Sequence, residues 1–188
     1  KEPRGRVRFL SDDEREILLV ACKQSKASYL YPLVVLALST GARRGELLGL
    51  TWGDIDLKRK VAILHKTKNE ERRALPLAGH ALDCVEKLSE IRRIDTNLLF
   101  PDETGKKPIE IRPAWERVLK EAGIEDFKFH DLRHSAASYL AMNGASLAEI
   151  AEVLGHKTLQ MVKRYSHLSE QHTASVVSKM NEKIFGNR

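Results

Sequence analysis

The stretch "FHDLRHSAASYL", residues 129–140, carries side chains that could act on an anion. Read as a helix, it has one apolar stripe suited to a core, made of Leu132, Ala136, Tyr139 and Leu140. His130, Arg133 and His134 fall on another stripe, because they are spaced three and four residues apart. A guanidinium group presents a planar fork of donors that fits a phosphate, and an imidazole can move a proton near neutral pH. The stretch therefore predicts an anion site beside an apolar face.

A second candidate region follows in "SLAEIAEVLGHKTLQMVKRYSHL". Ser146 and Glu149 form a capping box, and Gly155 is the residue type that ends a helix in the left-handed region. His156 is then placed just beyond a rigid helix end. Tyr165 comes after two basic residues, and a tyrosine hydroxyl can attack phosphorus to form a covalent ester. Its ordinary pKa is about 10, so nearby positive charge must help to form the phenolate.

The stretch "TGARRGEL" places Arg43 at a helix start, directly after a glycine turn. Helix starts expose backbone N–H groups and favour anions. Arg43 and Arg133 together could clamp the nonbridging oxygens of a phosphate. Taken alone, Arg43 and Glu46 have an ordinary explanation as a surface pair three residues apart, worth a few tenths of a kcal/mol.

Composition favours a single soluble domain that contacts a polyanion. The 188 residues include 32 Lys and Arg against 26 Asp and Glu, a net charge of +6 that leans toward DNA or RNA as a partner. Cys22 and Cys84 lie in separate apolar, helix-like contexts, which predicts buried thiols in a reducing cytosol. The first ten residues lack the apolar region of a signal peptide, and no apolar run is long enough to span a bilayer.

Hydrophobic periodicity predicts a mainly α-helical α+β domain over residues 1–188. The expected helices lie near 11–24, 29–39, 43–50, 79–93, 111–122, 130–142, 146–154, 158–166 and 169–183. A capping box of Ser11 and Glu14 opens the first, and the second stops at Gly41. Between them, short alternating runs predict three antiparallel strands near 52–57, 61–66 and 72–77. The expected fold is a helical domain with one small three-stranded antiparallel sheet.

Five sequence boxes, in this order, resemble those of the tyrosine recombinases, the phage integrase family. They are "TGARRGEL", "TKNEERRALPL", "HDLRH", "LGH" and "RYSHL", and they run from Thr40 to Leu168. The resemblance implies the catalytic-domain fold of that family. It also implies site-specific cutting and rejoining of DNA through a 3′-phosphotyrosyl intermediate, for integration or excision of a phage or mobile element, without ATP, metal or other cofactor.

The resemblance also assigns site residues, box by box. The catalytic positions that match the family pattern are Arg43, Lys68, His130, Arg133, His156 and Tyr165. In this comparison Tyr165 is the nucleophile, Arg43 and Arg133 stabilise charge on the phosphate, and His156 adds a hydrogen bond. His130 handles the tyrosine proton. Lys68 matches the general acid for the leaving oxygen, with Lys66 as the alternative on the same side of an extended strand, and Glu46 matches a supporting residue that orients a neighbour.

Partners follow from the same resemblance. Family members act on double-stranded DNA as tetramers that join two sites, and residues 169–188 are the expected segment exchanged between protomers. They also carry an N-terminal DNA-clamping domain. Since Lys1 lies almost directly before the first expected helix, we expect that clamp to be missing from this chain. The isolated domain is then expected to be a monomer that binds DNA weakly and with strong salt dependence.

Three alternatives remain open from the residues alone. Residues 146–165 also fit two helices joined by a tight turn, as in a non-catalytic helix-turn-helix repressor, although that reading leaves "TGARRGEL" and "HDLRH" unexplained. A type IB topoisomerase-like enzyme would share the phosphotyrosine chemistry but relax supercoils without joining two sites. A metal site at His130 and His134 lacks an acidic or cysteine partner at zinc-site spacing.

Overall fold

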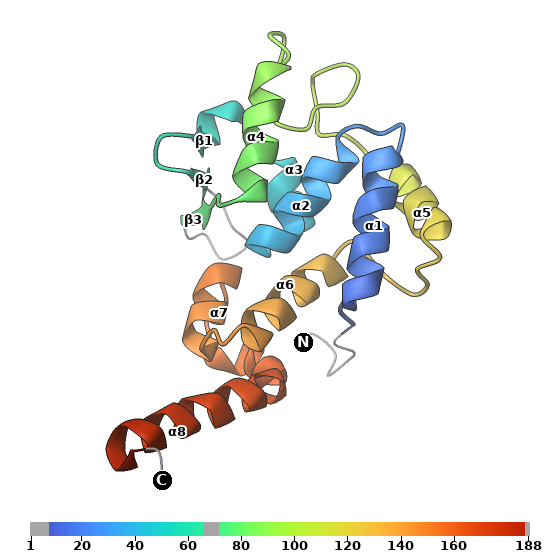
Figure 1. The fold of residues 1–188 in the computed structure, drawn as a ribbon. Coiled ribbons are helices and arrows are strands. Elements are labelled where there is room, and N and C mark those ends of the chain that lie inside the picture. The colour runs from blue at the N-terminus through green and yellow to red at the C-terminus, as the bar shows by residue number, and fades with distance from the viewer. Residues whose placement is uncertain (1–7, 66–71, 187–188) are drawn as a thin grey trace. The chain divides into compact units, whose positions relative to one another are not determined.

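The computed structural model describes residues 8–65 and 72–186. The chain divides into two compact units, Lys1–Ser135 and Ala136–Arg188, which are described separately below. Both are mainly helical, and a small antiparallel sheet lies in the first (Figure 1). Within the described part of the chain, no helix is both long enough and apolar enough to cross a membrane.

Helices form most of the first unit. They are α1 (Asp12–Gln24), α2 (Leu30–Thr40), α3 (Arg44–Leu48), α4 (His80–Glu90), α5 (Arg112–Glu121) and the first turn of α6 (Asp131–Met142). The predicted capping box of α1 is confirmed, because the Ser11 hydroxyl accepts from the Glu14 N–H and the Glu14 carboxylate accepts from the Ser11 N–H. Helix α2 is buried along most of its length and packs against both α1 and α4 (Figure 1).

The sheet has the order β1–β2–β3, with both pairings antiparallel. Its strands are β1 (Ile55–Asp56), β2 (Val61–Leu64) and β3 (Arg73–Pro76), and Leu64 lies opposite Arg73. The prediction of a strand from residue 52 is wrong, because Trp52–Asp54 form a short 3₁₀ helix, η1. The Asp54 carboxylate accepts from both the backbone N–H and the hydroxyl of Thr51, each at 2.7 Å, and this closes a tight turn before β1.

The core of the first unit is one cluster of buried side chains that come from α1, α2, α4, α5 and the sheet. Leu18, Leu33 and Leu75 are almost completely buried there. Each such side chain stabilises the fold by about 1.5–3 kcal/mol relative to an exposed position. As predicted, Cys22 and Cys84 are buried free thiols. This core supports α3, which carries Glu46 and begins directly after Arg43.

The second unit contains the rest of α6, then α7 (Leu147–Leu154), η2 (Leu159–Met161), η3 (Lys163–Ser169) and α8 (Glu170–Phe185). The predicted capping box at Ser146 and the left-handed stop at Gly155, with φ 63°, are both confirmed. The predicted α-helix over 158–166 is wrong, because two 3₁₀ segments occupy that range. Val162 and Tyr165 are both buried and are three residues apart, and a 3₁₀ helix superimposes residues at that spacing on one side.

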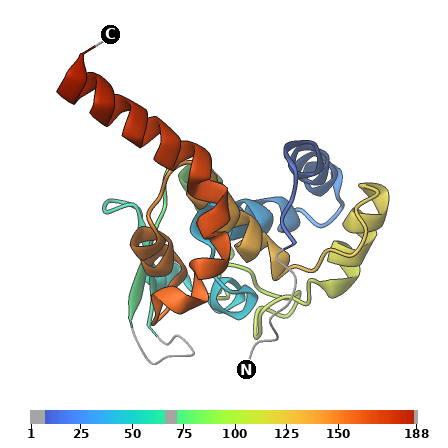
Figure 2. The ribbon, with the colours of Figure 1, turned by 90° about the horizontal axis from the view of Figure 1, so that it is seen from below.

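Helix α8 extends from η3 as one straight helix, away from α7 (Figure 2). Its start packs on the α6–α7 turn: a Cβ added to Gly144, which has φ +87°, would lie 2.6 Å from the ring of His172. Further along, α8 exposes an apolar stripe made of Val176, Val177, Met180, Ile184 and Phe185. The helix expected near 169–183 is therefore confirmed, and much of its apolar surface faces solvent.

Candidate active site

A tight turn after α2 sets the position of Arg43. The Thr40 hydroxyl donates to the Leu36 carbonyl at 2.7 Å and accepts from the Ala42 N–H at 3.2 Å. Gly41 ends α2 with φ 60° and ψ 16°, a conformation that other residues adopt at a cost of about 1–2 kcal/mol. The chain then enters α3 with Arg43 directly before its first residue, as the sequence predicts.

Glu46 fixes both the backbone and the side chain of Arg43. Its Oε2 accepts from the Arg43 backbone N–H at 2.8 Å, and its Oε1 accepts from Arg43 Nη1 at 2.7 Å. The N–H that the sequence offered to an external anion is therefore used within the chain. The Glu46 side chain is only 7% exposed, whereas that of Arg43 is 24% exposed. Arg43 thus keeps an accessible part while its orientation is set from behind.

A second guanidinium, from Arg73 on β3, contacts the same carboxylate. Arg73 Nη2 lies 2.9 Å from Glu46 Oε2, and the Arg73 side chain is 11% exposed. Burial lowers the pKa of Arg73, the negative charge of Glu46 opposes this, and the positive charge of Arg43 lowers it further. The sequence analysis gave Arg73 no role. The only signal in the sequence was an arginine inside a predicted strand, which does not identify its carboxylate partner.

Arg133 is nearly buried, although its spacing predicted a polar face. Only 4% of the residue is exposed, and its Nη1 donates to the Gly41 carbonyl at 2.6 Å. The bond joins the first turn of α6 to the turn that precedes Arg43. Within the first unit, the structure therefore brings Arg133 next to the Arg43 turn, as a phosphate clamp would require.

His130 lies at the exposed start of α6, where its carbonyl accepts from the Arg133 N–H at 3.1 Å. Its ring meets that of His134 edge to face, with centroids 5.4 Å apart. Lys68, the predicted general acid, and its alternative Lys66 both lie outside the described residues. In the described ranges, 8–65 and 72–186, no three His, Cys, Asp or Glu side chains are grouped to hold a metal ion.

His156 and Tyr165 belong to the second unit. His156 follows the left-handed Gly155, and its backbone N–H donates to the Ala151 carbonyl at 2.8 Å, so the end of α7 fixes its position. Tyr165 lies in η3, where its N–H donates to the Val162 carbonyl at 3.0 Å, and only 1% of the residue is exposed. Because α7 and η3 pack against each other, both residues are held by the same small helical cluster.

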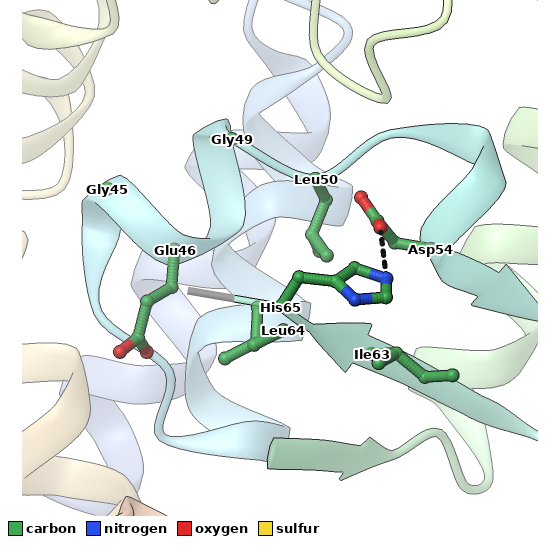
Figure 3. A pocket seen from close by; sticks show the side chains of 8 residues that line it. All are labelled: Gly45, Glu46, Gly49, Leu50, Asp54, Ile63, Leu64 and His65. Carbon is green, nitrogen blue, oxygen red and sulfur yellow. Dashed lines mark ion pairs between the residues drawn. The ribbon is translucent and has the colours of Figure 1, made fainter. Parts of the chain in front are cut away.

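A pocket of about 300 Å³ lies between α3 and β2 (Figure 3). It is lined by Gly45, Glu46, Gly49, Leu50, Asp54, Ile63, Leu64 and His65. His65 Nε2 lies 3.2 Å from Asp54 Oδ1, which links the end of β2 to η1. The Glu46 carboxylate points away from this pair (Figure 3) and toward its two arginine partners. Glu46 therefore lines the pocket while its carboxylate pairs with the two arginines.

Comparison with known proteins places this site in a family. A sequence model of the Phage integrase family matches residues 8–172. The integrase of Salmonella phage P22 is 33% identical over 193 residues, which cover 96% of this chain and 49% of that protein. A shufflon-specific DNA recombinase from Escherichia coli is 36% identical over 165 residues, covering 87% of this chain and 41% of the relative. The chain thus spans about half the length of these curated relatives.

A solved structure confirms the predicted fold class. The catalytic domain of bacteriophage HP1 integrase superimposes with a TM-score of 0.72 and 27% sequence identity. The match covers 97% of this chain and 100% of that one. The helical architecture with one small antiparallel sheet is therefore that of a recombinase catalytic domain.

Proposed function

We propose, from the premise that the chain belongs to the phage integrase family, that it is the catalytic domain of a site-specific DNA recombinase. One observation carries this proposal: the family match over residues 8–172 includes every candidate site residue from Arg43 to Tyr165. The names of the relatives, a phage integrase and a shufflon-specific DNA recombinase, support double-stranded DNA as the substrate. Integration or excision of a phage or mobile element is the reaction class proposed here, in a prokaryotic cytosol.

In the proposed chemistry, the Tyr165 hydroxyl attacks the scissile phosphorus. A bond forms between phosphorus and the tyrosine oxygen, and the bond from phosphorus to the 5′ oxygen breaks. His130 takes the tyrosine proton, and Lys68 gives a proton to the leaving 5′ oxygen. The product is a 3′-phosphotyrosyl ester and a free 5′-hydroxyl. A 5′-hydroxyl from another strand reverses these steps and rejoins the DNA, so the ester conserves the bond energy.

The arginines supply the electrostatic part of this reaction. Arg43 and Arg133 neutralise the charge that develops on the nonbridging oxygens, and His156 adds a hydrogen bond to them. The Glu46 carboxylate and the Gly41 carbonyl hold the two guanidiniums before DNA binds. Groups fixed in advance need no reorganisation during the reaction, which is the condition for strong transition-state stabilisation.

Assembly on DNA is the second part of the proposal. We propose that active complexes are tetramers on two DNA sites and that α8 docks on a neighbouring copy of the chain. The exposed stripe of α8, which includes Met180 at 49% and Phe185 at 67% exposure, supports this role. Light scattering tests it: we expect a monomer without DNA, and a defined multimer on paired sites that is lost when residues 169–188 are removed.

A covalent trap tests the reaction itself. The protein is mixed with nicked duplexes that cover the attachment region, in EDTA and without ATP, and denaturing gels detect DNA joined to protein. We expect an adduct that Tyr165→Phe abolishes. Adduct formation with supercoil relaxation but no recombinants would indicate a topoisomerase. If a longer protein with an N-terminal DNA-clamping domain binds its own site and forms no adduct, the chain is a non-catalytic DNA-binding protein.

A further inference from the structure

The Glu46 carboxylate lies between two guanidiniums from different elements. Arg43 approaches from the start of α3 at 2.7 Å, and Arg73 approaches from β3 at 2.9 Å. The Glu46 and Arg73 side chains are 7% and 11% exposed, so water screens their charges poorly. In such a setting, removing one charge changes the field felt by the other two.

Among Arg43, Glu46 and Arg73 themselves, the charges do not cancel. These two guanidiniums and one carboxylate sum to a single positive charge, because guanidinium groups stay protonated in proteins. The pKa of Arg73 is lowered by burial, raised by Glu46 and lowered again by Arg43, so the two cations act on each other. Without Arg73, Glu46 would neutralise Arg43, and the cluster would carry no net charge.

We propose that Arg73 is a positioning residue for strand cleavage. The proposal rests on the function proposed above. Arg73 Nη2 occupies Glu46 Oε2, which limits how far that carboxylate can neutralise Arg43. Arg43 thereby offers both its charge and its accessible N–H groups to the scissile phosphate. The contact also ties β3 to α3, so the sheet helps to hold Arg43 in place. Arg73 acts on the phosphate through its neighbours, without touching it.

Substitutions that separate charge from hydrogen bonding test this role. Arg73→Gln keeps a donor for Glu46 but removes the charge, and Arg73→Met removes both. We expect each to slow single-turnover cleavage by about 10²-fold, the effect of losing one preorganised charge-stabilising group. Arg73→Lys should retain most of the rate. Adding Glu46→Gln to either neutral variant returns a single positive charge to the cluster, and we expect it to restore cleavage about tenfold or more.

A neutral substrate distinguishes this role from a purely structural one. DNA with a methylphosphonate at the scissile position lacks the phosphate charge, so Arg73→Gln should slow its cleavage less than about threefold. A structural defect would slow both substrates equally. All rates are measured below the melting temperature of each variant, and Arg73→Gln is decisive if Arg73→Met does not fold.

With the single variants, two results would overturn the inference: native cleavage rates in both neutral variants, or equal slowing on the charged and neutral substrates. A double variant no faster than its parent would do the same. A different result would reject the function proposed above: no Tyr165-dependent DNA adduct, either from the native chain or from a longer protein that carries the N-terminal DNA-clamping domain. An adduct from the native chain, together with unaffected Arg73 variants, rejects only the role of Arg73.

Discussion

Replacing Arg133 with lysine tests the site and its packing together. Only 4% of Arg133 is exposed, and its Nη1 donates to the Gly41 carbonyl at 2.6 Å. Lysine keeps the positive charge but has a single nitrogen, so it cannot hold the carbonyl and also present a planar fork to a phosphate. A buried carbonyl left without its donor costs about 1–3 kcal/mol. Loss of one preorganised contact to the transition state costs about 2.7–4 kcal/mol, or 10²–10³-fold in rate.

These magnitudes predict two separate outcomes for Arg133→Lys. A stability loss of 1–3 kcal/mol lowers the melting temperature of a domain of this size by roughly 2–12 °C. Single-turnover cleavage, measured well below that temperature, should fall by about 10²–10³-fold while DNA affinity changes little. Arg117→Lys, at an exposed position of α5, is the matched control and should alter neither quantity. Cleavage within threefold of the native rate would refute contact between Arg133 and the reacting phosphate.

Three further predictions concern stability and reactivity. Gly144→Ala should destabilise the fold by at least about 1–2 kcal/mol in thermal unfolding, because alanine is strained at φ +87°. Adding His172→Ala should relieve only the clash with the imidazole ring, so part of the loss remains. An unchanged melting temperature for Gly144→Ala would contradict this. The Arg8 guanidinium lowers the pKa of Glu14 to about 2, so this carboxylate stabilises the fold above its ordinary pKa of about 4.3, and the contribution is lost as pH falls toward 2. The free energy of unfolding in urea, measured from pH 6 to 2, should fall less with acid in Glu14→Gln than in the native protein. Equal slopes of this free energy against pH in the two proteins would reject the pairing of Glu14 with Arg8. Burial raises the pKa of Cys22 to about 12, so thiol reagents at pH 8 should label it only after denaturation, and rapid labelling of the native protein would contradict this.

Local signals in the sequence predicted the helix boundaries well. The capping boxes at Ser11 and Ser146, and the glycine stops at Gly41 and Gly155, all formed as expected. Each of these signals acts between residues at most four apart, so short sequence windows contain the whole interaction. The order of the recombinase boxes likewise predicted the fold from the sequence alone.

Longer-range packing explains what the sequence did not predict. Two 3₁₀ segments, with Val162 and Tyr165 buried, occupy a range where apolar spacing had predicted an α-helix, and spacing by three fits either kind of helix. The ion pair of Arg73 with Glu46 joins residues 27 apart, and nothing near Arg73 in the sequence marks its partner. Arg133 lies on the same helix stripe as polar residues, so the sequence predicted that it would be exposed. In the structure it is buried and donates to the Gly41 carbonyl, a contact that forms only when the turn after α2 is folded. The catalytic assignments stay predictions for every candidate, as does the supporting role of Glu46. The catalytic candidates are Arg43, Lys68, His130, Arg133, His156 and Tyr165.

The bond from Arg133 to Gly41 joins residues 92 positions apart and therefore links chemistry to the completion of folding. Closing a loop of that length costs roughly 4 kcal/mol of chain entropy, which neighbouring contacts in the finished core must offset. A nascent or partly unfolded chain cannot hold Arg133 beside the turn that orients Arg43. Under the proposed function, Arg133 is then not in place to contact the phosphate whenever the first unit is incomplete. Incompletely folded copies would therefore be unable to start DNA cleavage, so the proposed activity is tied to complete folding of this unit.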